Sequence, residues 1–349
     1  MSKVKPSFWG LGLAALAVFP LIVTNPTYTS IGVFALLFMA CATSWNMFSG
    51  YSGYVSLGSA IFYGCGAYTM ALVSTHVHMA GGAAQFWLVP LGGLVAMVVA
   101  VPVGAIALRV RRHTFVVITI ALFFVFQLLA INASFTGGAA GISLPLIPWL
   151  FNYYNLPFYY VALGMVIFAT VLSALVRRSR FGLQLLAIRD DEDRALGLGV
   201  RVTAVKLTGF TMSAFTIGMA GALYAMFIGQ IYPQFVFEPN FDITVALMAF
   251  LGGFGTLLGP LLGGLILESS QQYLTLSFSN GSLYLILFGV LFLLVILFMP
   301  QGIVPAVSKW WVGRGEKRAR ESQAGTAVST ASTMKANPTV DHAPAGAKP

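Results

Sequence analysis

The chain has 349 residues, of which 58% are hydrophobic and only 8% are charged, and its formal net charge is +9. Residues 6–108, 114–176 and 269–308 contain no Asp, Glu, Lys or Arg. A water-facing surface needs charge, whereas a charge near the bilayer centre costs roughly 2.5–3.5 kcal/mol. The composition therefore excludes a soluble globular protein and predicts an all-α, polytopic membrane protein.

Long apolar segments follow one another along the chain, each close to the ~20 residues that one membrane span needs. They are residues 8–23, 31–48, 56–74, 86–108, 114–131, 157–176, 207–228, 243–267 and 283–300. None alternates between polar and apolar residues as the strands of a membrane barrel do. We therefore expect a bundle of helices, and the 37 glycines suit close packing of helices in a membrane.

Basic residues gather in a few of the connections. Seven of the 19 Lys and Arg residues lie in 177–206, and five more lie in 309–320. By the positive-inside rule, the N-terminus, the 109–113 turn, the 177–206 loop and the C-terminus are cytoplasmic. This orientation explains the net positive charge of the chain, so binding to nucleic acid is not needed to explain it. We expect the first segment to be an uncleaved span.

The nine apolar segments conflict with this orientation. An odd number of spans that starts in the cytoplasm must end outside, whereas the basic residues place the C-terminus in the cytoplasm. One segment must therefore be something other than a single span. Residues 243–267 contain a run of glycines that ends at Pro260, and proline cannot donate a helix hydrogen bond. We therefore predict a broken or paired element there, beside eight full spans, which gives eight to ten spans in all. A single kinked helix with a different orientation of the C-terminus is the alternative.

Two regions follow from these patterns. Residues 1–308 form the predicted transmembrane domain, which includes the cytoplasmic loop 177–206. Residues 309–349 are first basic and then rich in Ala, Ser, Thr and Pro, so they bury too little apolar surface to fold. We expect them to form a disordered cytoplasmic tail.

The loop 177–206 contains more than an orientation signal requires. Five apolar residues in it have a loosely helical spacing, and the four acids of 190–193 interrupt them. Acidic residues contribute little to topology. We therefore predict a short helix that docks on a soluble partner, although a solvated loop is the alternative.

The loop is similar to the coupling segment of bacterial ABC-importer permeases, and most similar to the LivM-type permeases of branched-chain amino acid uptake. The matching residues are Ser179, Gly182, Ala187, Ile188, Arg189, the acids 190–192, Gly197 and Lys206. Three further blocks agree in the same order, and the four together cover about residues 40–305. These blocks are Asn46 with 50–68, 136–142, and 252–260 with Pro300 and Gly302.

The resemblance implies an ABC importer permease fold in a multi-pass protein of the inner membrane. It implies transport of branched-chain or other hydrophobic amino acids together with a related LivH-type permease, two cytoplasmic ATPase subunits and an extracytoplasmic solute-binding protein. The residues implied to couple to the ATPase are Arg189, Asp191, Glu192, Arg194, Ala195 and Gly197. The sequence has no phosphate-binding Gly-x-x-x-x-Gly-Lys-Ser/Thr loop, so we expect no ATP hydrolysis, cofactor or metal in this chain.

Polar and glycine residues in the spans are candidates for the solute pathway, because glycines admit backbone turns and hydroxyls can bind a polar solute. The candidate set is Asn46, Gly50, Gly53, Ser56, Gly58, Thr119, Thr136, Gly137 and Gly138. Helix packing and interhelical hydrogen bonds are the alternative roles. We expect Glu268 at the headgroup boundary, and Glu238 and Asp242 in an outer loop, where they either contact the binding protein or solvate the loop.

The sequence does not identify the solute, because the family usually has Gln and His where this chain has Tyr54 and Ser59. An importer of an amide, urea or an aromatic acid is one alternative. A stand-alone secondary transporter or channel is another, although spans with hardly an ionisable residue disfavour it. A membrane scaffold is the third.

Overall fold

The computed structural model describes residues 6–23, 25–76, 83–145, 154–277 and 302–306, and single positions between 289 and 297. Within these ranges the regular structure is helical except for one short antiparallel pair, β1 (Ile142–Ser143) with β2 (Gln230–Ile231). The predicted helical bundle is therefore confirmed. The expected tail 309–349 and most of the apolar segment 283–300 lie outside the described residues.

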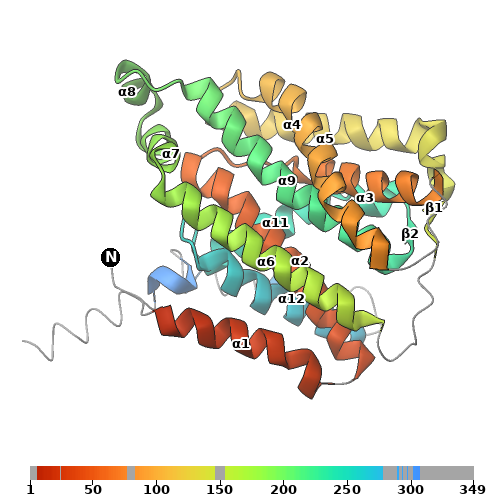
Figure 1. Cartoon of the computed structure of the whole chain (residues 1–349). Helices are drawn as coiled ribbons and strands as arrows, with labels where there is room; N and C mark the ends of the chain where they lie inside the picture. Colours follow the sequence, from red (N-terminus) through yellow and green to blue (C-terminus); the bar gives the residue numbers. More distant parts are fainter. Residues whose placement is uncertain are drawn as a thin grey trace, which may run out of the picture. The chain divides into compact units, whose positions relative to one another are not determined.

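The elements follow the predicted segments closely (Figure 1). The first half of the chain contains α1 (Pro6–Ile22), α2 (Pro26–Trp45), α3 (Ser59–His76), α4 (Val89–Ala107) and α5 (Arg112–Asn132). A π-helix, η1 (Asn46–Gly50), extends α2, and short 3-10 turns occupy Ala83–Leu88, Ser134–Thr136 and Gly138–Ala140. The second half contains α6 (Asn155–Arg178), α7 (Arg180–Asp190), α8 (Glu192–Gly197), α9 (Val202–Ile228), α10 (Pro233–Val236), α11 (Pro239–Gly252) and α12 (Gly259–Ser277).

Several of these helices can cross a membrane. Among the described residues, six stretches are long and apolar enough to do so. They are Pro26–Gly50, Gln85–Ala107, Arg112–Asn132, Asn155–Arg178, Val202–Ile228 and Pro233–Gly252. The chain is thus a multi-pass membrane protein, while the total of eight to ten spans stays a prediction.

Glycine packing sets the position of α9, which lies against α2, α3 and α4. A Cβ atom on Gly66 would lie 1.9 Å from the carbonyl oxygen of Gly218, and one on Gly221 would lie 1.9 Å from that of Tyr63. Cβ atoms do not approach oxygens so closely. Only glycine at these positions lets α3 and α9 meet at this distance.

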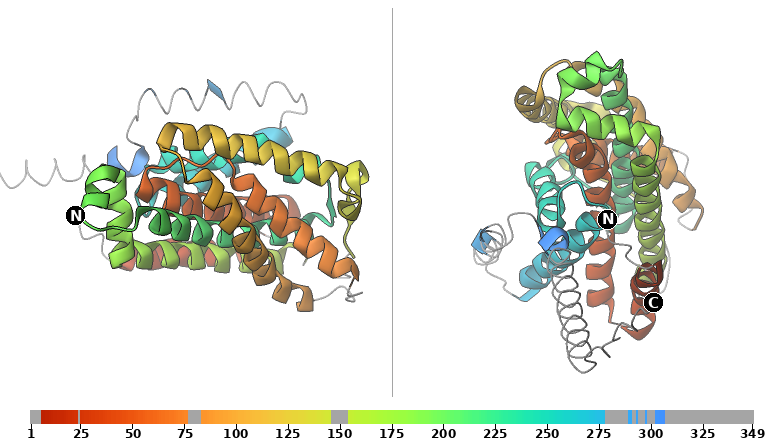
Figure 2. Two further views of the ribbon diagram at one scale, coloured as in Figure 1. Left: turned by 90° about the horizontal axis from the view of Figure 1, so that it is seen from above. Right: turned by 90° about the vertical axis from the view of Figure 1, so that its left-hand side faces the viewer.

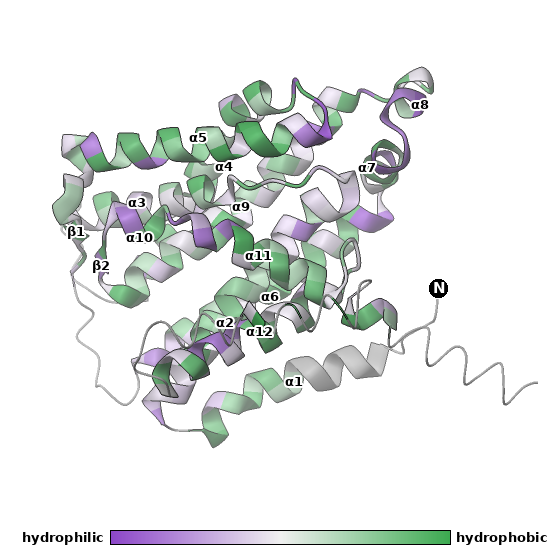
Figure 3. Cartoon of the chain, turned by 180° about the vertical axis from the view of Figure 1, so that it is seen from behind, coloured by the Kyte–Doolittle hydropathy of each residue, from purple (hydrophilic) through white to green (hydrophobic). Residues whose placement is uncertain are grey.

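The outward faces of α4, α5 and α6 are apolar. On α5 only Phe115, Thr119, Phe123 and Ala130 are buried, so most of that helix faces outward. Figure 3 shows hydrophobic colours along α4 and α5, whereas hydrophilic colours gather at α7 and α8. This distribution suits helices surrounded by lipid, with α7 and α8 in water.

The predicted break in 243–267 is confirmed. Helix α11 ends at Gly252 and α12 begins at Gly259, and Gly253 between them has a φ of 130°. A Cβ on Gly263 would lie 1.9 Å from the carbonyl oxygen of Met248, so α12 packs tightly against α11. Two separate helices thus stand where the sequence showed one apolar segment, and the orientation of the C-terminus stays a prediction.

A second break, between the predicted spans 31–48 and 56–74, lies further along the chain than predicted and is buried. Residues 56–74 read as one apolar segment, but α3 begins only at Ser59. Residues 53–58, which we call the unwound segment, have no helical structure, and Gly53 has a φ of 74°. The segment is nevertheless largely buried between α2 and α3, so its backbone groups need partners from elsewhere.

Two acids do not lie where we expected. Asp242 is in the first turn of α11 with 2% of its surface exposed, rather than in a solvated outer loop. Its carboxylate accepts hydrogen bonds from the backbone N–H groups of Ser59 (2.6 Å) and Ala60 (3.3 Å) at the start of α3. Glu268, expected at the headgroup boundary, is buried within the bundle and accepts a hydrogen bond from Gln272.

Candidate functional site

The loop 177–206 contains two helices rather than the single short helix that we predicted. Ser179 caps α7 by accepting a hydrogen bond from Gly182 N–H at 3.2 Å. Asp191 is extended and caps α8 by accepting one from Arg194 N–H at 3.0 Å. Short polar side chains at these positions satisfy the free N–H groups of a helix start. The two helices lie at one end of the molecule, which faces the viewer in the right-hand panel of Figure 2.

The coupling candidates point in different directions. Arg194 forms an exposed ion pair with Asp191 (3.0 Å), and a Cβ on Gly197 would meet nothing within 4 Å. Ala195 is buried instead. Both neighbours of Gly197 are exposed leucines, Leu196 at 61% and Leu198 at 83%. The sequence pattern counted these leucines as helix spacing and did not show that both are exposed at the C-terminal end of α8.

Glu192 turns inward. Its carboxylate forms an ion pair with the Lys206 ammonium at 2.8 Å and accepts a hydrogen bond from the Tyr54 hydroxyl. Lys206 Nζ also donates to the Tyr54 hydroxyl at 3.1 Å and lies 4.3 Å from the centre of the Tyr54 ring. These contacts join α8, α9 and the unwound segment, and we call the three residues the Tyr54–Glu192–Lys206 cluster.

The cluster keeps Glu192 ionised. Burial alone would raise the pKa of the Glu192 carboxyl. The hydrogen bonds from Lys206 and Tyr54 and the charges of Lys206 and Arg112 outweigh burial and hold this pKa below its ordinary value. The negative charge that balances the buried ammonium is therefore present at neutral pH.

Two arginines connect α7 to other elements. Arg189 donates to the carbonyl oxygen of Gly50 at 2.7 Å, and its guanidinium lies 5.2 Å from the centre of the Phe254 ring. Arg112 at the start of α5 donates to the carbonyl oxygens of Ile188 (2.7 Å) and Arg189 (2.6 Å). Since a helix ends in unpaired carbonyl groups with partial negative charge, Arg112 completes the end of α7.

Asn46 and Gly50 contact the turn between α11 and α12. Asn46 accepts a hydrogen bond from Gly255 N–H and donates one to the carbonyl oxygen of Thr256, both at 2.8 Å. A Cβ on Gly50 would lie 3.0 Å from the Cα of Gly255. The end of α2 is thus joined directly to the predicted break.

Side chains satisfy the backbone of the unwound segment. Ser56 N–H donates to the Ser49 hydroxyl at 3.3 Å, and Leu57 N–H donates to the Thr119 hydroxyl at 3.2 Å. A Cβ on Gly58 would lie 2.9 Å from the carbonyl oxygen of Thr119. The Ser56 hydroxyl is buried without a hydrogen-bond partner in the described part of the chain.

The remaining pathway candidates lie elsewhere. Thr136 donates to the carbonyl oxygens of Ala130 (2.6 Å) and Ala133 (2.7 Å) just beyond α5. Gly137 and Gly138 follow in left-handed backbone, with φ of 73° and 56°, shortly before β1. Figure 1 shows β1 at the end of the molecule opposite α7 and α8. The nine candidates therefore form two groups, with Thr136, Gly137 and Gly138 at one end and the others around the two breaks.

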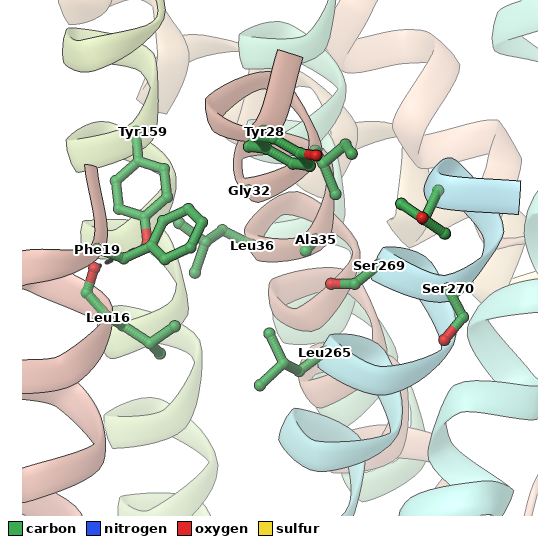
Figure 4. A pocket seen from close by; sticks show the side chains of 12 residues that line it. Leu16, Phe19, Tyr28, Gly32, Ala35, Leu36, Tyr159, Leu265, Ser269 and Ser270 are labelled. Carbon is green, nitrogen blue, oxygen red and sulfur yellow. Dashed lines mark hydrogen bonds between the residues drawn. The ribbon is translucent and has the colours of Figure 1, made fainter. Parts of the chain in front are cut away.

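A large cavity of about 450 Å³ contains none of these candidates. Figure 4 shows it between α1, α2, α6 and α12, with Phe19, Leu36 and Leu265 among its lining residues. The lining is mainly apolar, and polar groups are limited to tyrosines and two serines. This composition suits a lipid chain better than a zwitterionic amino acid.

Comparisons with known proteins agree with one another. Residues 27–296 match the family model described as the permease component of the branched-chain amino acid transport system. The chain is 30% identical to the high-affinity branched-chain amino acid transport system permease protein LivM of Escherichia coli K12 over 87% of its own length and 76% of that protein. It is 27% identical to the LivH permease of the same organism, over 77% of the chain and 92% of that protein.

More distant similarity reaches another kind of importer. The ribose import permease protein RbsC of Bacillus subtilis is 26% identical over 39% of this chain and 44% of that protein. No solved structure matches the chain.

Proposed function

The chain belongs to the family of branched-chain amino acid transport system permease components, and from this membership we propose that it is one permease subunit of an ATP-driven ABC importer. It works with a related LivH-type permease, two cytoplasmic ATPase subunits and an extracytoplasmic solute-binding protein. The observation that carries the proposal is the family match over residues 27–296 together with the exposed leucines at the C-terminal end of α8. The subunit itself performs no hydrolysis.

We place the docking surface on Leu196, Gly197 and Leu198. Leu196 and Gly197 end α8 and Leu198 follows it, and Gly197 leaves space for a neighbouring chain. The two leucines are 61% and 83% exposed at the end of a short polar helix, which favours contact with a protein partner. Arg194, paired with Asp191, provides the polar edge of this surface. Glu192 and Ala195 support this face from inside.

In the proposed orientation the loop 177–206 and both termini are cytoplasmic. Residues 1–308 form the transmembrane domain, and 309–349 form a cytoplasmic tail. The two groups of pathway candidates then lie toward opposite sides of the membrane, with Thr136, Gly137 and Gly138 at the side where the binding protein delivers the solute. Thr119 and Ser56 face the solute further in.

The proposed solutes are branched-chain and other hydrophobic amino acids. Tyr54 and Ser59, where the chain departs from its family, contribute to the buried cluster and to the start of α3. Their side chains are therefore engaged within the protein, and the departures give less reason to expect a different solute. An importer of another small solute is the second candidate, favoured by the similarity to a ribose permease.

Docking is tested with Gly197→Trp in the complete transporter. A bulky side chain at an open position on α8 should abolish cross-linking to the ATPase and lower ATP-driven uptake of labelled leucine by at least about tenfold. Gly164→Trp is the matched control, since a Cβ on Gly164 also meets nothing within 4 Å but lies on α6. Wild-type uptake by Gly197→Trp would contradict docking through α8. Competition of leucine uptake by ribose, urea or an amide, but not by isoleucine or valine, would favour the second candidate.

A further inference from the structure

Movement of α8 has a direct route into the membrane domain. The cytoplasmic helices contact both breaks, through Glu192 to the unwound segment and through Arg189 to η1 and the α11–α12 turn. We infer that Tyr54, Glu192 and Lys206 are positioning residues that carry displacement of α8 to the unwound segment and so to the start of α3. This inference rests on the proposed function, because it requires an ATPase that moves α8.

The cluster is built to hold three elements in register. Each member comes from a different element, and the Tyr54 hydroxyl both accepts from Lys206 and donates to Glu192. The Lys206 side chain is only 3% exposed, and its ammonium lies against these two partners. A buried ion pair adds little stability over a well-packed apolar replacement, but removing one partner leaves an unpaired charge. Such a cluster therefore fixes relative position more than it stabilises the fold.

The unwound segment can respond to that displacement. It lacks the repeating hydrogen bonds of a helix, and its N–H groups bind side chains of Ser49 and Thr119 instead. Exchange of a few such bonds costs less than breaking a helix, so the segment can act as a hinge between α2 and α3. The five residue steps from Tyr54 to Ser59 span at most roughly 18 Å, which limits how far the ends can separate.

The far end of the segment is also anchored. Asp242 on α11 binds the first two N–H groups of α3, and Asn46 and Arg189 join the other end of α11 to the end of α2 and to α7. Displacement of α8 therefore pulls on α3 through Tyr54 while Arg189 moves the α11–α12 turn. Arg112 ties the end of α7 to the start of α5, so movement of α7 also reaches α5.

The test compares ATP hydrolysis with solute uptake in proteoliposomes that contain the complete transporter. Tyr54→Phe removes one hydroxyl and keeps the ring, Lys206→Met removes the charge and keeps the stem, and Lys206→Arg keeps the charge. We expect Tyr54→Phe and Lys206→Met to retain ATP hydrolysis within about twofold. The ATP consumed per solute should rise about tenfold, which is the effect expected from the loss of one charge-assisted hydrogen bond. Lys206→Arg should restore part of the wild-type ratio.

Asp193→Asn is the matched control. It removes one negative charge beside Glu192 but breaks only the exposed pair with Arg111, so the ratio should equal that of the wild type. A direct measurement uses a label on Leu57→Cys, with Cys41 and Cys65 replaced. Its accessibility should change when ATP binds in the otherwise wild-type protein, and should stay constant in Tyr54→Phe.

Each outcome decides between the claims. A wild-type ratio in both Tyr54→Phe and Lys206→Met would overturn the inference and leave the proposed function intact. Loss of the assembled transporter in Tyr54→Phe as well as Lys206→Met would show a structural role only, and would also overturn it. Uptake by the wild-type protein that needs no ATP would overturn the proposed function itself, and the inference with it.

Discussion

Removing the Asp242 carboxylate should destabilise the start of α3. The residue is 2% exposed, and its two oxygens accept from Ser59 N–H at 2.6 Å and Ala60 N–H at 3.3 Å. In Asp242→Ala both N–H groups lose their acceptor inside the bundle. Each buried donor without a partner costs roughly 1–3 kcal/mol, so the loss of both should lower the free energy of unfolding by about 2–6 kcal/mol. Asp242→Asn keeps one acceptor and should lose about half as much.

The assay is denaturant unfolding of the purified protein in detergent, combined with hydrogen exchange of the Ser59 and Ala60 amides. Exchange at these two amides should accelerate in Asp242→Ala while the amides in the middle of α9 keep their protection. Glu238→Ala is the control, because Glu238 is half-buried and accepts only from the exposed Asn240 side chain among the described contacts. Unfolding of Asp242→Ala at the same denaturant concentration as Glu238→Ala would refute the assignment of Asp242 as the cap of α3.

Three further outcomes are expected. The pKa of Glu192 in the folded protein lies below its ordinary value, so its contribution is complete above about pH 4.5 and is lost only as the pH falls through the lower folded value. The ATP-to-solute ratio should therefore be constant between pH 6 and 8. A marked change in that range would contradict the ionised pair. Gly66→Ala places a Cβ 1.9 Å from a carbonyl oxygen of α9, so it should sharply reduce the amount of folded protein in the membrane, whereas Gly164→Ala should not. Equal amounts of the two variants by immunoblot would be inconsistent with this packing. An impermeant thiol reagent on intact cells should label Ala139→Cys and not Asp193→Cys, and the reverse pattern would invert the proposed topology.

The long-range contacts mark the limit of sequence reasoning. The break at 252–260 could be predicted because glycines and a proline weaken a helix locally. The position and burial of the unwound segment could not, since Thr119, which accepts from Leu57 N–H, lies 62 residues away in sequence, and Asp242, which binds the start of α3, lies 183 residues from Ser59. For the same reason Asp242 and Glu238 looked equivalent, although only one is buried.

The coupling loop shows the same limit on a smaller scale. A run of acids next to leucines predicts a charged helix in water, and α7 and α8 agree with that expectation. The run of acids alone does not show which acid faces inward, because that depends on Lys206 in the next helix and on Tyr54 in a distant segment. Family resemblance pointed to Glu192 and Gly197 together, while the structure places them on opposite sides of α8.

The central claim is that ATP hydrolysis by a partner drives solute through this subunit. The most direct measurement is uptake of labelled leucine by proteoliposomes that contain the chain, its related permease and the binding protein, with and without the ATPase subunits and ATP. We expect uptake only when both ATPase and ATP are present, at a rate that follows hydrolysis. Uptake that proceeds without ATPase, driven by an ion gradient alone, would contradict the account.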